Sequence, residues 1–313
     1  MDIHLHSGRK PQVLLLGNGM LQLAHGMDWN TLIAPLNTRQ VPEPVLAQLP
    51  MSMKPETMFG TRFEHISKHM ADVLLQAKPC LSPQLDRLLS LDFDCILTTN
   101  YTYEIEQTLA GERWVKSGRR SSFSYCGEGH AKQHNLQCCY IVSGRSGRQI
   151  PVWHVHGDAC RSTSLVLSYH SYVRASSLLF AYSQSRKNIF WESQQEARPI
   201  VPQAWFDWFL CGDVYSVGFG WNPCEVDLWW AAERKSREKA VVGSHVAYFT
   251  DDIRQDAQKE MLRAMNTEVC VVPLDGDNYG AVYEAVTEDI RKRIQRADAA
   301  ARQAVPEDPV AHS

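Results

Sequence analysis

Short apolar runs alternate with longer amphipathic segments along this chain. Five runs end at or near turn-forming residues, which is typical of strands buried on both faces of a parallel sheet. The predicted strands are residues 13–16, 94–99, 214–217, 245–249 and 268–272. Apolar residues recur at helical spacing between and after them, within residues 63–74, 226–239, 262–265 and 282–294. The alternation of strands and helices predicts an α/β fold with a doubly wound, mostly parallel, Rossmann-like sheet.

Two stretches interrupt this alternation. Residues 111–147 are rich in Gly, Ser, Arg and His, and we predict an inserted loop or small subdomain there. Residues 169–210 are predicted to form a smaller, mainly helical insertion. We therefore expect one domain over residues 1–297, followed by a flexible C-terminal tail over residues 298–313.

Charge and composition exclude several classes of protein. The 32 Lys and Arg against 35 Asp and Glu give a formal charge of −3, without the basic excess of a general nucleic-acid binder. No run of about 18 apolar residues predicts a membrane-spanning helix, and the N-terminus does not resemble a secretory signal. Nine cysteines, an odd number without C-x-x-C spacing, indicate reduced thiols. These features predict a cytoplasmic protein.

Candidate chemistry follows the first two predicted strands. Gly17-Asn18-Gly19 ends the first strand, where small residues let backbone N–H groups approach a phosphate. The same motif also fits a plain strand–helix turn. The second strand ends in Thr98-Thr99-Asn100-Tyr101. Asn100 can hold a ribose hydroxyl or position a water molecule, although a helix cap is the structural alternative.

Two histidines lie in the segment Trp153 to Asp158. His154 and His156 alternate in an extended segment and are expected to share one face. Gly157 marks the end of that segment, so His156 is the one nearer the strand tip. Histidine is well suited to accept a proton near neutral pH. We therefore place His156 at the site and leave His154 a structural role.

These motifs, in this order, resemble the sirtuin-like superfamily. The resemblance is closest to the zinc-free, sirtuin-like NAD hydrolases of bacterial antiphage defence, and it covers about residues 13–286. Beyond the segments already named, the matching residues are Trp29, Glu106, Tyr169, Tyr172, Val217-Gly218-Phe219-Gly220, Asn222-Pro223 and Pro273-Leu274-Asp275.

The resemblance implies an NAD hydrolase that cleaves the nicotinamide–ribose N-glycosidic bond to give nicotinamide and ADP-ribose. It implies that Asn100 lies by the nicotinamide ribose and orients the attacking water. It also implies that His156 is the general base or orients the ribose. The implied NAD-binding residues are Gly17, Asn18 and Gly19 at the pyrophosphate, Thr99 and Tyr101 beside Asn100, and Gly218, Phe219 and Asn222 on the adenosine side.

The chemistry of the implied reaction makes modest demands on the protein. Cleavage passes through an oxocarbenium-like state, as in glycoside hydrolysis. Nicotinamide leaves a cationic ring as a neutral molecule, so no strong general acid is required. The protein has to position NAD, stabilise the ribosyl cation and deliver water to it.

The sequence departs from the family pattern in two places. Thr102 stands where an Asp is common, which leaves recognition of the nicotinamide carboxamide open. The two C-x-x-C zinc pairs of sirtuin deacetylases are missing, which counts against a deacetylase, and we expect no bound metal. The resemblance implies an NAD-depleting effector, and no separate sensor domain is evident. We therefore expect a homo-oligomer and a separate sensor or activator protein, without membrane or direct nucleic-acid binding.

Three alternatives stay open. One is a sirtuin-type deacylase or ADP-ribosyltransferase, which needs a second groove for an acceptor. Another is a non-catalytic NAD- or ADP-ribose-binding assembly subunit, which Thr102 keeps open. The third is a zinc-dependent, nucleic-acid-associated protein built on Cys126, His130, His134 and Cys138.

The charged stretch 233–239 is expected to form a solvated helix face.

Overall fold

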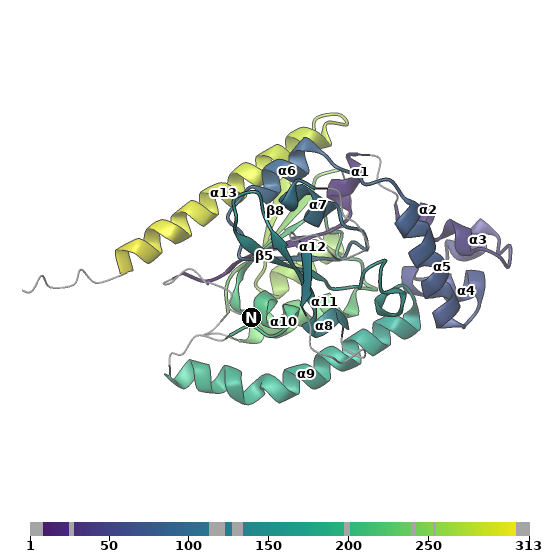
Figure 1. Cartoon of the computed structure of the whole chain (residues 1–313), viewed down its shortest axis with the longest axis horizontal. Coiled ribbons are helices and arrows are strands. Elements are labelled where there is room, and N and C mark those ends of the chain that lie inside the picture. The colour runs from purple at the N-terminus through teal and green to yellow at the C-terminus, as the bar shows by residue number, and fades with distance from the viewer. Residues whose placement is uncertain are drawn as a thin grey trace, which may run out of the picture.

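The computed structural model describes residues 9–24, 28–112, 123–126, 134–196, 201–238, 242–252 and 255–304. In this part of the chain eight strands form one sheet, in the order β3-β4-β5-β2-β1-β6-β7-β8 (Figure 1). The strands are β1 (Gln12–Leu16), β2 (Cys95–Thr98), β3 (Phe123–Cys126), β4 (Cys139–Ser143), β5 (Gln149–His154), β6 (Asp213–Val217), β7 (His245–Thr250) and β8 (Glu268–Val272). The predicted α/β class and the five predicted strands are confirmed.

The strand order places a topological switch point at the centre of the sheet. The strands from β5 to β8 are parallel, and their order β5-β2-β1-β6-β7-β8 corresponds to the Rossmann order 3-2-1-4-5-6. Leu16 at the end of β1 is in register with Thr98 of β2 and Val217 of β6. The turns that follow these three strands therefore leave the sheet at the same level.

Helices cover both faces of the sheet. Val13 and Leu15 of β1 belong to the core on one face, and Leu14 and Leu16 to the core on the other, as strand alternation requires. The first face is covered by α8 (His134–Gln137), α9 (Tyr169–Glu196), α10 (Trp205–Cys211), α11 (Val226–Arg237) and α12 (Asp256–Ala264). The second is covered by α1 (Gly19–Gln22), α6 (Pro83–Leu89), α7 (Glu104–Ala110) and α13 (Tyr279–Ala304). Within the described ranges, none of the helices is both long and apolar enough to cross a bilayer.

A small helical unit between β1 and β2 has a core of its own. Its elements are α2 (Trp29–Ile33), η1 (Ala34–Leu36), α3 (Glu43–Leu46), η2 (Met51–Met53), α4 (Lys54–Phe59) and α5 (Phe63–Gln76). Figure 1 shows α2 to α5 together at one end of the molecule. Leu165 and Leu167, which follow η3 (Ser162–Ser164), complete the core of this unit. The sequence predicted only α5, whereas the helical insertion predicted at 169–210 forms α9 and α10 against the sheet.

Two boundary predictions differ from the structure. The segment 111–147 contributes β3 and β4, which extend the sheet as antiparallel strands, so it is more than an inserted loop. α13 continues past residue 297 to Ala304, because Asp298 to Ala304 is rich in alanine and contains neither Gly nor Pro. Arg9 Nε lies 2.6 Å from Asp298 Oδ1, which ties this last part of the helix to the start of β1.

Lys235 was expected on a solvated helix face, and this expectation is wrong. The side chain is buried, and its Nζ donates hydrogen bonds to the backbone oxygens of Phe209 (2.8 Å), Leu210 (2.9 Å) and Gly212 (2.7 Å). These carbonyl groups lie at the C-terminal end of α10, where a helix lacks intrahelical donors. Burial lowers the pKa of the Lys235 ammonium to about 7.

Replacing Lys235 is expected to destabilise the contact between α10 and α11. Lys235→Met removes the donor that three buried carbonyl oxygens share, although the Leu210 oxygen still accepts from the Gly243 N–H. The free energy of unfolding should therefore fall by about 1–3 kcal/mol, as measured by urea denaturation at pH 6. Arg237→Met on the same helix is the control. Its side chain is largely exposed, and the change should stay within about 0.5 kcal/mol. Equal effects of the two substitutions would contradict the capping role.

Candidate functional site

A cleft of about 1150 Å³ opens where the turns after β1, β2 and β6 meet. Ligands of open α/β sheets bind at this position, outside the carboxyl ends of the strands at the switch point. The predicted site residues that line it are Asn18, Gly19, Thr99, Asn100, Tyr101, His156, Gly218, Phe219 and Asn222. The structure thus brings together every predicted site residue except Gly17.

Gly17 contacts the turn after β6 and does not line the cleft. A Cβ atom at this position would lie 2.3 Å from the backbone oxygen of Gly218 and 2.6 Å from the Cα of Phe219. The Gly19 N–H donates to the same Gly218 oxygen at 2.8 Å. Gly218 has a φ of 61°, a backbone conformation that favours glycine. The expected pyrophosphate contact of Gly17 is therefore replaced by packing between two turns.

Asn100 is held at the cleft by the end of β1. Its side-chain Nδ2 donates to the Gly17 oxygen at 3.4 Å, and its backbone N–H donates to Thr98 Oγ1 at 3.1 Å. Thr98 Oγ1 in turn donates to the Leu16 oxygen at 2.9 Å. The residue is only 6% exposed although it lines the cleft. These bonds fix the side-chain amide in place before any ligand binds.

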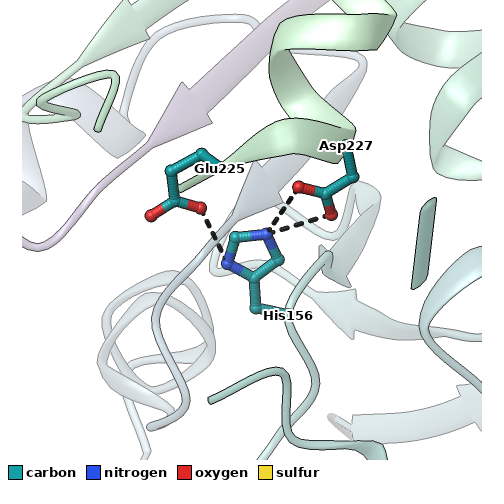
Figure 2. Close-up of side chains that lie close together, drawn as sticks. All are labelled: His156, Glu225 and Asp227. Atoms are coloured by element: carbon teal, nitrogen blue, oxygen red, sulfur yellow. Dashed lines mark hydrogen bonds and ion pairs between the residues drawn. The ribbon is translucent and has the colours of Figure 1, made fainter. Parts of the chain in front are cut away.

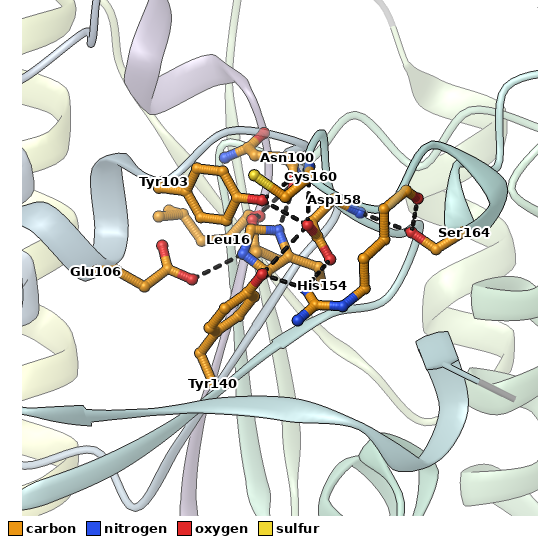
Figure 3. A network of polar contacts seen from close by, with 11 residues as sticks. Leu16, Asn100, Tyr103, Glu106, Tyr140, His154, Asp158, Cys160 and Ser164 are labelled. Atoms are coloured by element: carbon orange, nitrogen blue, oxygen red, sulfur yellow. Dashed lines mark hydrogen bonds and ion pairs between the residues drawn. The ribbon is translucent and has the colours of Figure 1, made fainter. Parts of the chain in front are cut away.

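His154 holds the backbone of Asn100 from beneath (Figure 3). Its Nδ1 lies 2.6 Å from the Asn100 backbone oxygen, and its Nε2 lies 2.7 Å from Glu106 Oε1. Burial alone would lower the pKa of the imidazole, but the Glu106 carboxylate and these hydrogen bonds raise it to about 9. At neutral pH both ring nitrogens therefore carry protons and donate. His154 is structural, as the sequence predicted.

A second buried carboxylate, Asp158, supports this arrangement. The hydroxyl groups of Tyr103 and Tyr140 donate to its Oδ1, and Arg161 donates to its Oδ2 at 3.0 Å (Figure 3). The rings of Tyr103 and Tyr140 meet the His154 ring edge-on, with centroids 5.6 Å and 5.7 Å away. The turn after β5 is thus a fully hydrogen-bonded support beside the cleft.

His156 lies between two carboxylates (Figure 2). Its Nε2 is 3.1 Å from Asp227 Oδ2, and its Nδ1 is 3.3 Å from Glu225 Oε2. Burial lowers the pKa of the imidazole, but the charges of Asp227 and Glu225 outweigh burial and raise it to about 9. The ring is therefore a cation at neutral pH. This geometry does not favour the expected general base, and it leaves His156 a positioning role.

Sequence reasoning missed Glu225 and Asp227. Glu225 immediately precedes α11, and Asp227 occupies the first turn of that helix. Glu225 lines the cleft and is 7% exposed. Burial raises the pKa of its carboxyl, the charge of His156 partly offsets that, and the result is about 7. Two carboxylates two residues apart, five and seven residues after the end of the V-G-F-G turn, were the available sequence signal.

The same three side chains form one compact cluster, and the protonation of His156 opposes a role as metal ligands. Ligand atoms of His156, Glu225 and Asp227 all lie within 4.8 Å of one another. A metal needs a neutral imidazole nitrogen, and the raised pKa of His156 opposes that state. Of the alternative zinc site, His130 and the side chains of Cys126 and His134 lie outside the described residues.

Thr102 also lines the cleft, in the position where the sirtuin-like pattern has an Asp. Its side chain hydrogen-bonds Glu104, and both residues line the cleft.

No protein-family model matches this chain, and no curated protein is similar enough in sequence to count as a relative.

Breaking the His154–Glu106 pair is expected to destabilise the protein in a pH-dependent way. The pKa of His154 is higher in the folded state than its ordinary value near 6.5, so its stabilising contribution is complete below about pH 6.5 and is lost as pH rises towards 9. His154→Gln should therefore lower the free energy of unfolding by about 2–4 kcal/mol at pH 6. The deficit should be much smaller at pH 9.5, as urea denaturation at both pH values will measure.

A double-mutant cycle with Glu106→Gln tests whether this pair is the cause. The two substitutions should be non-additive by about 1–3 kcal/mol at pH 6, because each one alone removes the opposite charge with which the remaining partner is paired. Additive effects, or a deficit that does not change with pH, would contradict the ion pair.

The contact between the turns after β1 and β6 predicts the effect of a single methyl group. Gly17→Ala places a Cβ against backbone atoms that have little room to move, so the free energy of unfolding should fall by about 1–3 kcal/mol. Gly280→Ala in α13 is the control, because its Cβ would meet the side-chain ends of Gln84 and Asn278 rather than backbone atoms. That variant should be neutral or slightly stabilising in the same thermal or urea denaturation. A neutral Gly17→Ala would contradict the close packing of the turns.

Proposed function

We propose that this protein hydrolyses NAD at the nicotinamide–ribose N-glycosidic bond and releases nicotinamide and ADP-ribose. One observation carries the proposal. A cleft at the switch point of a Rossmann-like sheet brings a fixed amide, Asn100, next to a buried charged cluster around His156. These residues come from the ends of two different strands, β2 and β5.

The dimensions and walls of the cleft suit a dinucleotide. Its volume of about 1150 Å³ exceeds that of most pockets for small ligands. Aromatic residues line it at several levels, and flat rings pack well against the faces of a nicotinamide or adenine. These residues are Trp29, Tyr101, Phe219, Tyr248 and Tyr283.

The charges of the site suit the transition state of this reaction. Positive charge develops on the ribose as the bond to nicotinamide breaks, and carboxylates fixed nearby stabilise it. Glu225 lines the cleft and carries such a carboxylate. Asn100 provides an amide that can hold a ribose hydroxyl or an attacking water.

The resemblance to sirtuin-like NAD hydrolases supports the same reaction and suggests its setting. In this proposal the protein is an NAD-depleting effector of bacterial antiphage defence that acts in the cytoplasm. A partner protein or assembly into a homo-oligomer switches it on. The second candidate function is a non-catalytic NAD- or ADP-ribose-binding assembly subunit. It is favoured by the contact of both His156 ring nitrogens with carboxylates, which leaves no free base on the imidazole.

Nicotinamide release from NAD by the full-length chain tests the proposal. The wild type should release nicotinamide, and Asn100→Ala should lower the rate by about 100-fold or more while it still binds NAD in calorimetry. Asn30→Ala, at an exposed position outside the cleft, is the matched control and should act like the wild type.

NAD levels in cells that express the chain complete the test, because a partner can be present there. Binding of NAD without turnover, both in the purified protein and in cells, would favour the assembly subunit. A chain that neither binds NAD nor depletes it would contradict both functions.

A further inference from the structure

Glu225 is the carboxylate of this cluster that lines the cleft. The side chain is nine-tenths buried, and its Oε2 lies 3.3 Å from His156 Nδ1 as an ion pair that lacks the geometry of a hydrogen bond. Its backbone is held in place, because its N–H donates to the Asn222 oxygen at 2.9 Å and its oxygen accepts from the Trp229 N–H at 3.0 Å. Because this ion pair falls short of a hydrogen bond, the buried carboxylate can still accept a hydrogen bond from a ligand or water in the cleft.

Asp227 has a different place in the cluster. Both of its oxygens contact His156 Nε2, at 3.1 Å and 3.3 Å, and Oδ1 also accepts the Leu228 N–H at 3.0 Å. It does not appear among the described residues that line the cleft. Figure 2 shows the imidazole between the two carboxylates, Asp227 on one side and Glu225 on the other. Asp227 therefore holds the ring, and Glu225 is the carboxylate that a ligand meets.

We propose that Glu225 is the catalytic carboxylate of the NAD hydrolase reaction and that His156 and Asp227 are positioning residues behind it. This inference rests on the proposed function and reverses the order of roles that the sirtuin-like resemblance implies. Glu225 stabilises the ribosyl cation and accepts a proton from the attacking water. His156, held by Asp227, orients the Glu225 carboxylate and lowers its affinity for protons.

The reaction balances with water as the only co-reactant. The bond between ribose C1′ and the nicotinamide ring nitrogen breaks, and its electron pair neutralises the pyridinium. A water oxygen forms the new bond to C1′, and one water proton passes to the Glu225 carboxylate and then to solvent. The products are nicotinamide, ADP-ribose and one proton, and no group is oxidised or reduced.

The titration of Glu225 sets the expected pH dependence. The ionisable groups that face it are His156 after β5, Asp227 on α11, Tyr172 on α9, Tyr101 after β2, and Cys224 in its own turn. Burial raises the pKa of Glu225, and the His156 cation and the Tyr172 hydroxyl lower it, so it titrates near 7. Turnover should therefore rise with pH through about 7, as the carboxylate loses its proton.

The pH profile of kcat for nicotinamide release by the full-length chain tests this assignment. Glu225→Gln should lower kcat by about 100-fold or more and remove the rise near pH 7, while the Kd for NAD changes by less than about threefold. Glu225→Asp keeps the charge one methylene further back and should have an intermediate kcat. Glu233→Gln on α11, whose partner is the exposed Arg237, should match the wild type. Urea denaturation confirms that each variant is folded.

His156→Asn separates positioning from proton transfer. Loss of the imidazolium charge raises the pKa of Glu225 further, so the rise in kcat should move to higher pH and part of the activity should return near pH 9. If His156 were the base, His156→Asn would stay inactive at every pH, and Glu225→Gln would keep a pH-dependent rise. That result overturns the inference but leaves the proposed function standing. A wild-type chain that releases no nicotinamide, alone or in cells, overturns both.

Discussion

The contact between the glycines that follow β1 and β6 is the constraint on which the cleft depends. Gly17 and Gly218 bring two turns to within backbone contact at the centre of the sheet. Asn100 is anchored to the oxygen of Gly17, and Glu225 follows a few residues after Gly218. One steric requirement, met only by residues without a side chain, therefore sets the distance between the two halves of the site.

Two buried imidazolium ions show how similar residues acquire different tasks. His154 donates to a backbone oxygen and to one carboxylate, and it is closed off from the large cleft by tyrosines. His156 contacts two carboxylates, one of which lines the cleft. Because a buried charge is tolerated only with partners, each ring is fixed by the acids around it. The position of those acids decides which ring can influence a substrate.

The sequence predicts the elements whose burial imposes a pattern of apolar residues. It does not predict the elements and side chains whose placement is determined by tertiary contacts. Apolar runs predicted β1, β2, β6, β7 and β8 of the parallel strands, and polar residues at the ends of two of them indicated the cleft. The antiparallel strands β3 and β4 were not predicted, because their segment is rich in Gly and Ser. The short helices α2 to α4 were not predicted, because each is too short to show a helical period of apolar residues. Charged residues such as Glu225, Asp227 and Lys235 are normally solvated, so their residue type gave no reason to place them in the interior.

The buried lysine of α11 has a kinetic consequence. Reagents that attack neutral amines react slowly with surface lysines near neutral pH, because those amines are protonated. Lys235 has a lowered pKa but is enclosed by carbonyl oxygens, so a reagent reaches it only after α10 and α11 separate. Its rate of acylation therefore reports how often that pair of helices opens.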